Sequence, residues 1–553
     1  MWRRGVDFFK SLKSRLNIDS LHLVGLFAFY FGFILNMSFW RFIYSRLEIA
    51  SAGAALFAVS LPILGMAIFV WIFDLLLLPR VGKWIIIPLL LISSGTNYLM
   101  FNLGAFIDLE MARNVFETNA REAFDLITAS GVVWVFSTGV IPAALLFFTK
   151  INFYPPRKEI LRRAAVFLAA MLAVGIICAA SYRECAPFIR NNKQMRKLLN
   201  TVNYVYSVAR YFQTKAKANR PFVWLDENAK LSPDREGRTT VLVFILGETA
   251  RAKNFSLGGY GRKTNPLLEK QDIIYFKNVK SCGTSTAISA PCIFSSKTRK
   301  EFRADEAKTT ENLLDLIKKA GYDIFWLEND DGCKGVCDRV AVENMVSSGA
   351  KEYCFGQYCL DEALLKGLEE KLKNIQKNTA IFLHTMGSHG PTYYQRYPEQ
   401  FRAFLPTCDT ADIQNCSKES IVNAYDNTIL YTDYIISSAI DALKKFPNLE
   451  AGLAYVSDHG ESLGENNIYL HGFPYAIAPA EQIEVPMLLW VSETMRRLNN
   501  IDYGRLGEMA KTKNYTHDNI FHSMLGLLGI ESKLYQADKD FIWESRRELG
   551  QGE

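Results

Sequence analysis

After Tyr182 the sequence has no apolar run long enough to cross a membrane, whereas before Tyr182 it has five. The five runs fall at roughly 21–44, 49–78, 84–106, 128–149 and 163–182. Each can cross a hydrocarbon core of ~30 Å, which takes ~20 helical residues. We therefore expect a transmembrane domain in 1–182 and a separate domain in 228–553 with its own core. The first run is too long for a removed signal peptide.

One connection between the runs is poor in basic residues. The third-to-fourth connection has only Arg113 and Arg121. Basic residues are frequent in the N-terminal segment and in the second-to-third and fourth-to-fifth connections: Arg3, Arg4, Lys10, Lys13, Arg15, Arg80, Lys83, Lys150, Arg157, Lys158, Arg162 and Arg163. Basic connections stay in the cytoplasm. Because the number of spans is odd, the second domain is expected on the outer side.

The cysteines agree with this topology. Eight of the ten form close pairs in the second domain: Cys282/Cys292, Cys333/Cys337, Cys354/Cys359 and Cys408/Cys416. Such pairs favour disulfides in an oxidising compartment, although Cys333 and Cys337 alone would also suit zinc. Cys178 and Cys185 would lie ~10 Å apart on one helix, beyond disulfide reach. They can pair only if that helix ends between them.

Residues 183–227 mix basic residues with tyrosine, phenylalanine and aliphatic residues. This pattern suits an interfacial helix on anionic membrane lipids, and it equally suits an amphipathic linker helix packed on the second domain. The topology and this segment explain the formal net charge of +6. Nucleic-acid binding is not needed to explain it, and we expect no such partner.

The second domain alternates strand and helix patterns, and no internal repeat or low-complexity tract interrupts them. Strands are expected at 239–246, 272–279, 322–327, 380–383, 453–456 and 487–491, and helices at 310–320, 361–376, 421–446 and 517–528. Thr310 is the expected N-cap of the first helix. The alternation predicts an α/β fold with a mostly parallel sheet.

The second domain lacks an obvious Ser-His-Asp arrangement. Instead, Glu248 and the pair Asp458-His459 each follow a short apolar run that is typical of a buried strand. Residues at the carboxyl ends of such strands meet at a crevice, and Glu, Asp and His together suit zinc or another divalent ion. A metal would also activate a threonine hydroxyl, which is a weak nucleophile by itself. Thr284 and Thr286 are both candidates.

Several motifs occur together and in order: Gly247-Glu248-Thr249, Cys282-Gly283-Thr284-Ser285-Thr286, a run from His384 to Pro391, and Ser457-Asp458-His459-Gly460-Glu461-Ser462. With the five spans, they resemble the lipid A phosphoethanolamine transferases, a family that includes the mobile colistin-resistance enzymes. The resemblance covers nearly the whole chain. It implies an alkaline-phosphatase-like (sulfatase-like) soluble domain in the periplasm, anchored in the bacterial inner membrane.

The resemblance also implies roles for individual residues. Glu248, Thr286, Asp458 and His459 match the family's zinc ligands, and Thr286 matches its nucleophile. Lys334, His389 and His471 match positions that hold the phosphate or a second zinc. Positions in the third-to-fourth connection match substrate contacts, and their spacing would place them on one helix face: Asn114, Thr118 and Glu122. A solvated polar face is the alternative for these three.

The expected reaction is zinc-dependent transfer of phosphoethanolamine from phosphatidylethanolamine to a lipid A phosphate through a covalent threonine intermediate, which would confer polymyxin resistance. We expect a monomer. Alternatives are a lipopolysaccharide-core acceptor, a lipoteichoic-acid-type phosphoglycerol transferase, and a catalytically inactive membrane-anchored sensor. The cysteine pairs and motifs favour phosphoethanolamine transfer over phosphoglycerol transfer, and the complete set of candidate ligands argues against the sensor.

Overall fold

The computed structural model describes residues 16–47, 49, 51–117, 126–192, 195–217, 221–330, 332–347, 351–355 and 358–546. Contacts divide the chain into two compact units, which are described separately below. The membrane unit comprises Met1–Leu109 and Ile127–Ala209, and the soluble unit comprises Glu110–Leu126 and Arg210–Glu553. The connection between the third and fourth spans therefore belongs to the soluble unit by its contacts.

The membrane unit contains five helical segments that are long and apolar enough to cross a membrane, as predicted: Ser20–Arg46, Ala52–Leu76 (α4), Gly82–Asn102 (α5), Ala129–Phe148 and Pro156–Ala180 (α10). The first segment is not one α-helix, because a 3-10 turn separates α2 (Ser20–Gly32) from α3 (Met37–Arg46). The fourth has a π-helical turn between α8 (Ala129–Val135) and α9 (Ile141–Phe148). α10 ends between Cys178 and Cys185, but the structure leaves both thiols free.

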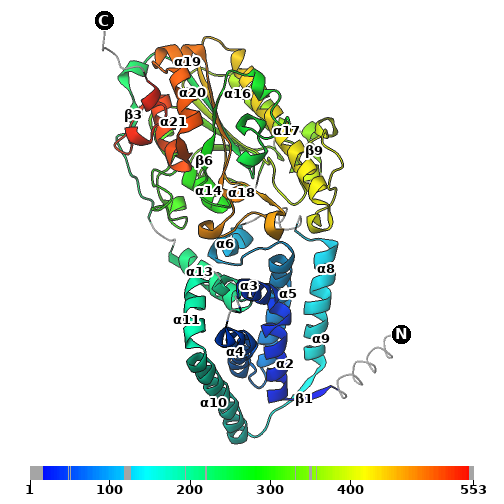
Figure 1. The fold of residues 1–553 in the computed structure, drawn as a ribbon. Coiled ribbons are helices and arrows are strands. Elements are labelled where there is room, and N and C mark those ends of the chain that lie inside the picture. Colours follow the sequence, from blue (N-terminus) through cyan, green and yellow to red (C-terminus); the bar gives the residue numbers. More distant parts are fainter. Residues whose placement is uncertain are drawn as a thin grey trace. The chain divides into compact units, whose positions relative to one another are not determined.

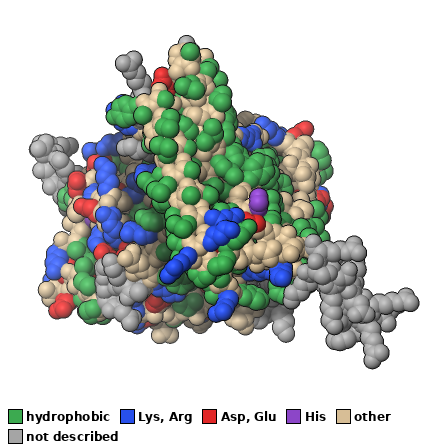
Figure 2. Space-filling model, turned by 90° about the horizontal axis from the view of Figure 1, so that it is seen from below, with side chains coloured by type: hydrophobic (Ala, Val, Ile, Leu, Met, Phe, Trp, Pro, Cys, Tyr) green, Lys and Arg blue, Asp and Glu red, His purple; other side chains and the backbone are tan. Residues whose placement is uncertain are grey.

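The start of the 183–227 segment inserts among the helices of the membrane unit. Asn200 is buried between α12 (Met195–Leu198) and α13 (Val202–Lys217). Its Nδ2 donates to the carbonyls of Leu35 and Ser93, both at 2.8 Å. Exposed side chains of the basic connections include Lys150, Arg157 and Lys158, and Figure 2 shows Lys and Arg side chains gathered beside hydrophobic surface on the face that it draws.

The soluble unit is built on a seven-stranded sheet with the order β5-β15-β12-β4-β11-β7-β8. Five neighbouring strands are parallel: β12 (Glu450–Ser457), β4 (Thr240–Gly247), β11 (Thr379–His384), β7 (Asp323–Glu328) and β8 (Ala341–Asn344). β15 (Met487–Val491) and β5 (Ile274–Phe276) add the antiparallel edge. Helices cover both faces of the sheet (Figure 1), which confirms the predicted α/β class.

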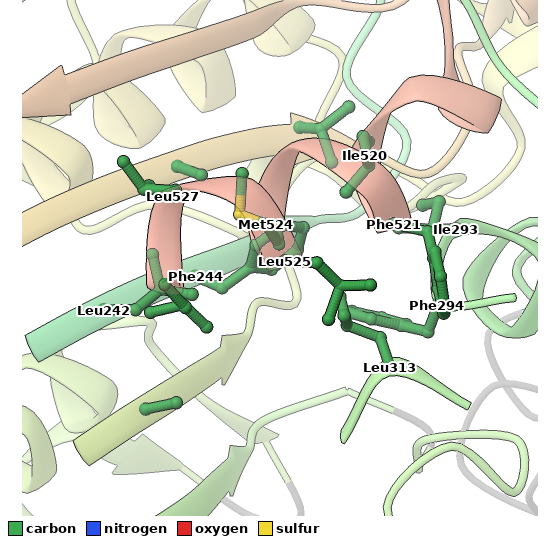
Figure 3. Packing of buried hydrophobic residues seen from close by; sticks show 14 of the residues in the cluster. Leu242, Phe244, Ile293, Phe294, Leu313, Ile520, Phe521, Met524, Leu525 and Leu527 are labelled. Carbon is green, nitrogen blue, oxygen red and sulfur yellow. The ribbon is translucent and has the colours of Figure 1, made fainter. Parts of the chain in front are cut away.

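Alternate side chains of β4 enter two separate cores. Leu242 and Phe244 pack under α21 (Ile520–Leu528), as Figure 3 shows. Val243 and Ile245 pack on the opposite face with α16 (Glu362–Leu372) and α17 (Lys418–Lys444). Because both faces of the sheet are covered, its central strands are apolar throughout. The buried polar residues Glu248 and Asp458 directly follow the last residues of β4 and β12.

Two local predictions are wrong. The single strand expected at 272–279 is two strands, β5 and β6 (Asn278–Lys280), which join different sheets. The expected N-cap, Thr310, lies before the helix instead. Asn312 caps α15 (Leu313–Lys319), because its side chain accepts from Leu314 N at 2.9 Å and forms a capping box with Asp315. The Thr310 hydroxyl donates to Glu306 O.

The structure joins the eight cysteines of the soluble unit in the four predicted pairs: Cys282–Cys292, Cys333–Cys337, Cys354–Cys359 and Cys408–Cys416. The first bridge links the loop before Thr286 to α14 (Thr286–Ile293). The second brackets Lys334. Two of the four bridges therefore constrain segments that carry predicted site residues.

Candidate metal centre and active site

Glu248 and Asp458 leave the sheet side by side. The parallel strands β4 and β12 pair Gly247 with Ser457 at their carboxyl ends, and Asp458 N donates to Gly247 O at 2.9 Å. The next residue on each strand therefore enters the same crevice. Glu248, Asp458 and His459 are all fully buried there.

These side chains have the spacing of metal ligands. His459 Nε2 lies 3.5 Å from Glu248 Oε1 and 3.3 Å from Asp458 Oδ2. The Thr286 hydroxyl donates to Glu248 Oε2 at 2.9 Å and lies 3.4 Å from His459 Nε2. Ligands around a tetrahedral zinc ion with bonds of ~2.1 Å lie about 3.4 Å apart. These four distances are thus close to the separations that ligands of a tetrahedral metal have.

Two further observations support a metal at this position. Asp458 Oδ2 is buried and has no hydrogen-bond partner within the described part of the chain. His459 Nδ1 lies 3.0 Å from Gly460 O, and donation of its hydrogen to that carbonyl leaves the Nε2 lone pair facing the carboxylates. A metal-bound histidine is commonly oriented by such a bond.

Burial of this cluster disfavours its charged forms. It raises the pKa of Asp458 to about 6, and burial together with Asp458 raises the pKa of Glu248. Burial, and then the neighbouring His471, lowers the pKa of His459 to about 4. Because buried carboxylates without a positive partner are costly, a divalent cation would stabilise the ionised pair. A neutral histidine is the form that binds a metal.

The two candidate nucleophiles have different surroundings. The Thr284 hydroxyl donates to Phe473 O at 2.6 Å and is buried, so a backbone carbonyl already engages it. Thr286 begins α14 and directs its hydroxyl at Glu248 and His459. The positive end of a helix favours an anionic group at this position. The geometry therefore supports Thr286 rather than Thr284 as the nucleophile.

The loop after β11 packs directly against the Glu248 backbone. Ser388 N donates to Glu248 O at 3.0 Å. Gly387 has a φ of +50°, and a Cβ at this residue would lie 2.6 Å from Glu248 O. Asp361 fixes the loop by accepting from Met386 N and Gly387 N at 2.9 and 3.0 Å. Only glycine allows this close approach.

His389 and His471 form a second layer beside the predicted ligands. The His471 ring centroid lies 4.4 Å from that of His459 and 5.7 Å from that of His389. His471 Nδ1 lies 2.8 Å from Glu461 Oε2. Burial alone would lower the pKa of His471, but the Glu461 carboxylate outweighs it and raises the pKa. The sequence reasoning gave Glu461 no role, although it lies two residues after His459.

Of the predicted substrate contacts, Asn114 and Lys334 fall on described residues. Asn114 lies on α6 (Leu109–Glu117) and its Nδ2 is 3.9 Å from where a Cβ on Gly472, next to His471, would stand. Lys334 lines a cavity of about 840 Å³ together with Ala287, the residue after Thr286. Thr118 and Glu122 lie outside the described residues.

Sequence reasoning also missed His517. Its Nδ1 accepts from Cys282 N at 3.0 Å, and its Nε2 lies 3.0 Å from Ser457 O. The side chain therefore ties the Thr286 loop to the end of β12. Burial lowers the pKa of His517 to about 3, so the imidazole is neutral and its Nε2–H donates to Ser457 O. The only sequence signal was a histidine at the start of a helix pattern.

Comparison with known proteins agrees with the fold and defines a membrane-anchored enzyme with a sulfatase-like soluble unit. The Sulfatase family matches residues 240–530, and the Phosphoethanolamine transferase EptA/EptB family matches residues 65–216. Phosphoethanolamine transferase EptA of Escherichia coli K12 is 40% identical, with 97% of this chain and 99% of that protein covered.

Two further relatives extend the comparison. Phosphatidylethanolamine transferase Mcr-1 of Escherichia coli is 34% identical over 83% of this chain and 86% of its own length. The structure of lipooligosaccharide phosphoethanolamine transferase A, an integral membrane protein of Neisseria meningitidis, superposes with a TM-score of 0.92 at 37% identity, covering 95% of this chain and 99% of that one. The chain belongs to the phosphoethanolamine transferase family. It is a transferase of the inner membrane whose soluble unit lies in the periplasm.

Proposed function

We propose that this enzyme transfers phosphoethanolamine from phosphatidylethanolamine to a phosphate of lipid A through an ester on Thr286. One observation carries the proposal: the Thr286 hydroxyl lies within 3.4 Å of both Glu248 and His459 at the carboxyl edge of the sheet. Such a cluster suits activation of a hydroxyl nucleophile by a metal.

Zinc is the cation that the donor set fits best, because two carboxylates, an imidazole and a hydroxyl stand at tetrahedral spacing. Held by Glu248, Thr286, Asp458 and His459, zinc would lower the pKa of the threonine hydroxyl and polarise a phosphoryl oxygen. Thr286 Oγ1 then attacks the donor phosphorus. The bond to the diacylglycerol oxygen breaks, and that oxygen takes the proton that Thr286 loses.

In the second step, a phosphate hydroxyl oxygen of the acceptor attacks the same phosphorus. The bond to Thr286 Oγ1 breaks, and Oγ1 takes the proton that the acceptor hydroxyl loses. We infer that Lys334, His389 and His471 bind the phosphoryl oxygens, since cations there stabilise developing negative charge. Asn114, Thr118 and Glu122 would contact the ethanolamine, whose ammonium suits a carboxylate. The enzyme would act as a monomer at the surface of the membrane lipids, with 183–227 as an interfacial segment between domains 1–182 and 228–553.

Addition of phosphoethanolamine converts a terminal lipid A phosphate into a diphosphate that carries an ammonium group. The net negative charge of the cell surface falls, which weakens the attraction of cationic peptides. Polymyxin resistance is therefore the expected phenotype. Mass spectrometry of lipid A from cells with and without the enzyme tests the reaction. A phosphoethanolamine adduct should appear only with the active enzyme. An adduct on the lipopolysaccharide core alone would instead identify the core as the acceptor.

The nucleophile is tested by matched threonine variants. Thr286→Ala should lower the transfer rate by about 10³-fold or more, whereas Thr284→Ala should keep most of it. Peptide mass spectrometry of the wild type incubated with donor alone should find phosphoethanolamine on Thr286. Retained transfer in Thr286→Ala together with loss in Thr284→Ala would move the nucleophile to Thr284.

A further inference from the structure

A second group of buried metal-ligating side chains lies on the other side of Glu248. β11 and β7 continue the sheet beyond β4, and their last residues, His384 and Glu328, are paired in register. One ligand atom each of Glu248, Asp330 and His384 lies within 4.8 Å of the other two, and all three residues are buried. Closure of this group around one ion needs only small side-chain rotations, because tetrahedral ligands stand about 3.4 Å apart.

The orientation of His384 is that of a metal ligand. Its Nδ1 lies 2.9 and 3.0 Å from the two oxygens of Glu328. Glu328 is itself fixed, since it accepts from Trp326 Nε1 and from Asp330 N, both at 2.8 Å. A histidine that gives one ring nitrogen to a carboxylate and directs the other inward is the usual arrangement at metal sites.

The second ring nitrogen of His384 faces the acidic residues. Nε2 lies 3.5 Å from Asp330 Oδ2, and it is buried with no hydrogen-bond partner among the residues that the structure describes. This separation is too long for a hydrogen bond but matches the distance between two ligands of one metal. An imidazole nitrogen aimed into a buried acidic pocket is thus left for a cation.

The buried negative charge of the region also favours a bound cation. Four buried carboxylates surround this edge of the sheet: Glu248, Glu328, Asp330 and Asp458. A cation beside these carboxylates would offset part of the cost of burying them. A proton on His384, held beside Glu328, would be the alternative to a second metal ion.

We propose that Glu248, Asp330 and His384 bind a second divalent metal ion, with Glu248 shared between it and the proposed zinc site. One imidazole and two carboxylates suit zinc or manganese(II). A second ion here would fix the shared carboxylate in place and so act on Thr286 through Glu248. This site differs from the His389 and His471 pair, which lies beside His459.

Metal counting on the purified full-length enzyme tests the proposal. The protein is saturated with zinc, desalted, and analysed by inductively coupled plasma mass spectrometry. Wild type should retain about two zinc ions per chain, and His384→Ala and Asp330→Asn should each lose one of them. Wild-type content of one, or unchanged content in both variants, would overturn the proposal and leave the protonated His384 as the cation.

Three other variants assign the loss to the correct site. Asp458→Asn should lose only the ion of the proposed zinc site, which separates failure of this proposal from failure of the proposed function. His471→Ala should keep both ions; loss of one there, with none lost in His384→Ala, would place the second ion at His471 instead. His522→Ala removes a buried histidine outside both clusters and should change nothing.

A spectroscopic measurement does not depend on variants that fold poorly. The metal-free wild type is titrated with manganese(II) and followed by electron paramagnetic resonance. Two ions that share a carboxylate lie ~3.5–4 Å apart, so their spins should couple as the second equivalent binds. A spectrum of uncoupled ions at two equivalents would contradict the shared Glu248. Addition of zinc should displace the coupled signal.

Discussion

One helix of the soluble unit and one helix of the membrane unit bury opposite kinds of side chain. On α21 of the soluble unit, all nine residues from Ile520 to Leu528 are buried. On α10 of the membrane unit, Glu159 is the buried residue of the described helix, and leucines such as Leu168 and Leu172 are more than 60% exposed. An apolar helix is therefore part of the core in the soluble unit, whereas the apolar helix α10 lies on the surface of the membrane unit.

The solvent explains this difference. In water, burial of apolar area contributes ~25 cal/mol per Å², so the soluble unit covers both faces of its sheet. In a membrane, lipid is as apolar as leucine, and packing and hydrogen bonds between helices become the source of specificity. The polar interior around Asn200 fits this role. In the soluble unit, buried polar side chains lie both along α17 and just beyond the ends of β4 and β12, where the predicted site residues are.

The largest expected effect is the loss of stability when the disulfides of the soluble unit are reduced. Reduction and alkylation of the four bridges should destabilise the soluble unit by about 2–3 kcal/mol for each loop closed. The membrane unit should not respond, because Cys178 and Cys185 are not joined. Urea unfolding followed by tryptophan fluorescence, with and without reductant, measures the difference. Labelling of the unreduced, denatured protein should modify two cysteines; ten labelled thiols would contradict the bridges.

A matched pair of leucines sharpens the comparison. Leu525→Ala in α21 should cost about 2–5 kcal/mol of stability, because it opens a cavity in a packed core. Leu172→Ala on the exposed face of α10 should cost less than about 0.5 kcal/mol, since lipid fills the space. Thermal unfolding in detergent measures both. Equal destabilisation would show that this face of α10 packs against protein.

Removal of a buried polar side chain should lower the stability of the membrane unit, by less than Leu525→Ala lowers the stability of the soluble unit. Asn200→Leu keeps the volume but deletes the two Nδ2 hydrogen bonds and the acceptor for Thr96 Oγ1, which lies at 2.7 Å. The expected cost is about 1–3 kcal/mol. Asn191→Leu, at an exposed residue near the end of α11 (Tyr182–Asn191), is the control and should be neutral. A stable Asn200→Leu protein would mean that the apolar contacts alone hold this unit together.

The sequence patterns predicted which segments form helices and strands better than they predicted where those helices and strands begin and end. Runs of β-branched and apolar residues marked β4 and β12 because both faces of the central strands are buried. The break at Lys277 between β5 and β6 was not visible, because the same alternation continues across it. The true N-cap of α15 was missed because Thr310 and Asn312 are both good caps, and the capping box of Asn312 with Asp315 is visible only in the structure.

The same limit applies to the candidate site: the sequence indicated residues at strand ends but not their partners elsewhere in the chain. Motifs next to strand ends indicated Glu248 and Asp458, since strand ends in parallel sheets meet in one crevice. His384 carried the same signal at the end of β11, but its partner Glu328 is 56 residues earlier in the chain. His517 contacts the site only through backbone atoms of Cys282 and Ser457. No local pattern records contacts of that kind.

The smallest predicted effect concerns the connection that the contacts assign to the soluble unit although it joins two membrane spans. If this segment serves the active site, Glu122→Gln should slow transfer from phosphatidylethanolamine in vesicles by about tenfold, at ~1.4 kcal/mol per decade. The reason is loss of a charge-assisted contact with the ethanolamine ammonium. Glu110→Gln, in the first turn of α6, is the matched control and should leave the rate unchanged.

Metal content should stay the same in both variants, so a change in rate alone reports donor binding. Equal rates for Glu122→Gln and wild type would show that Glu122 makes no contact with the donor and is only a solvated polar residue.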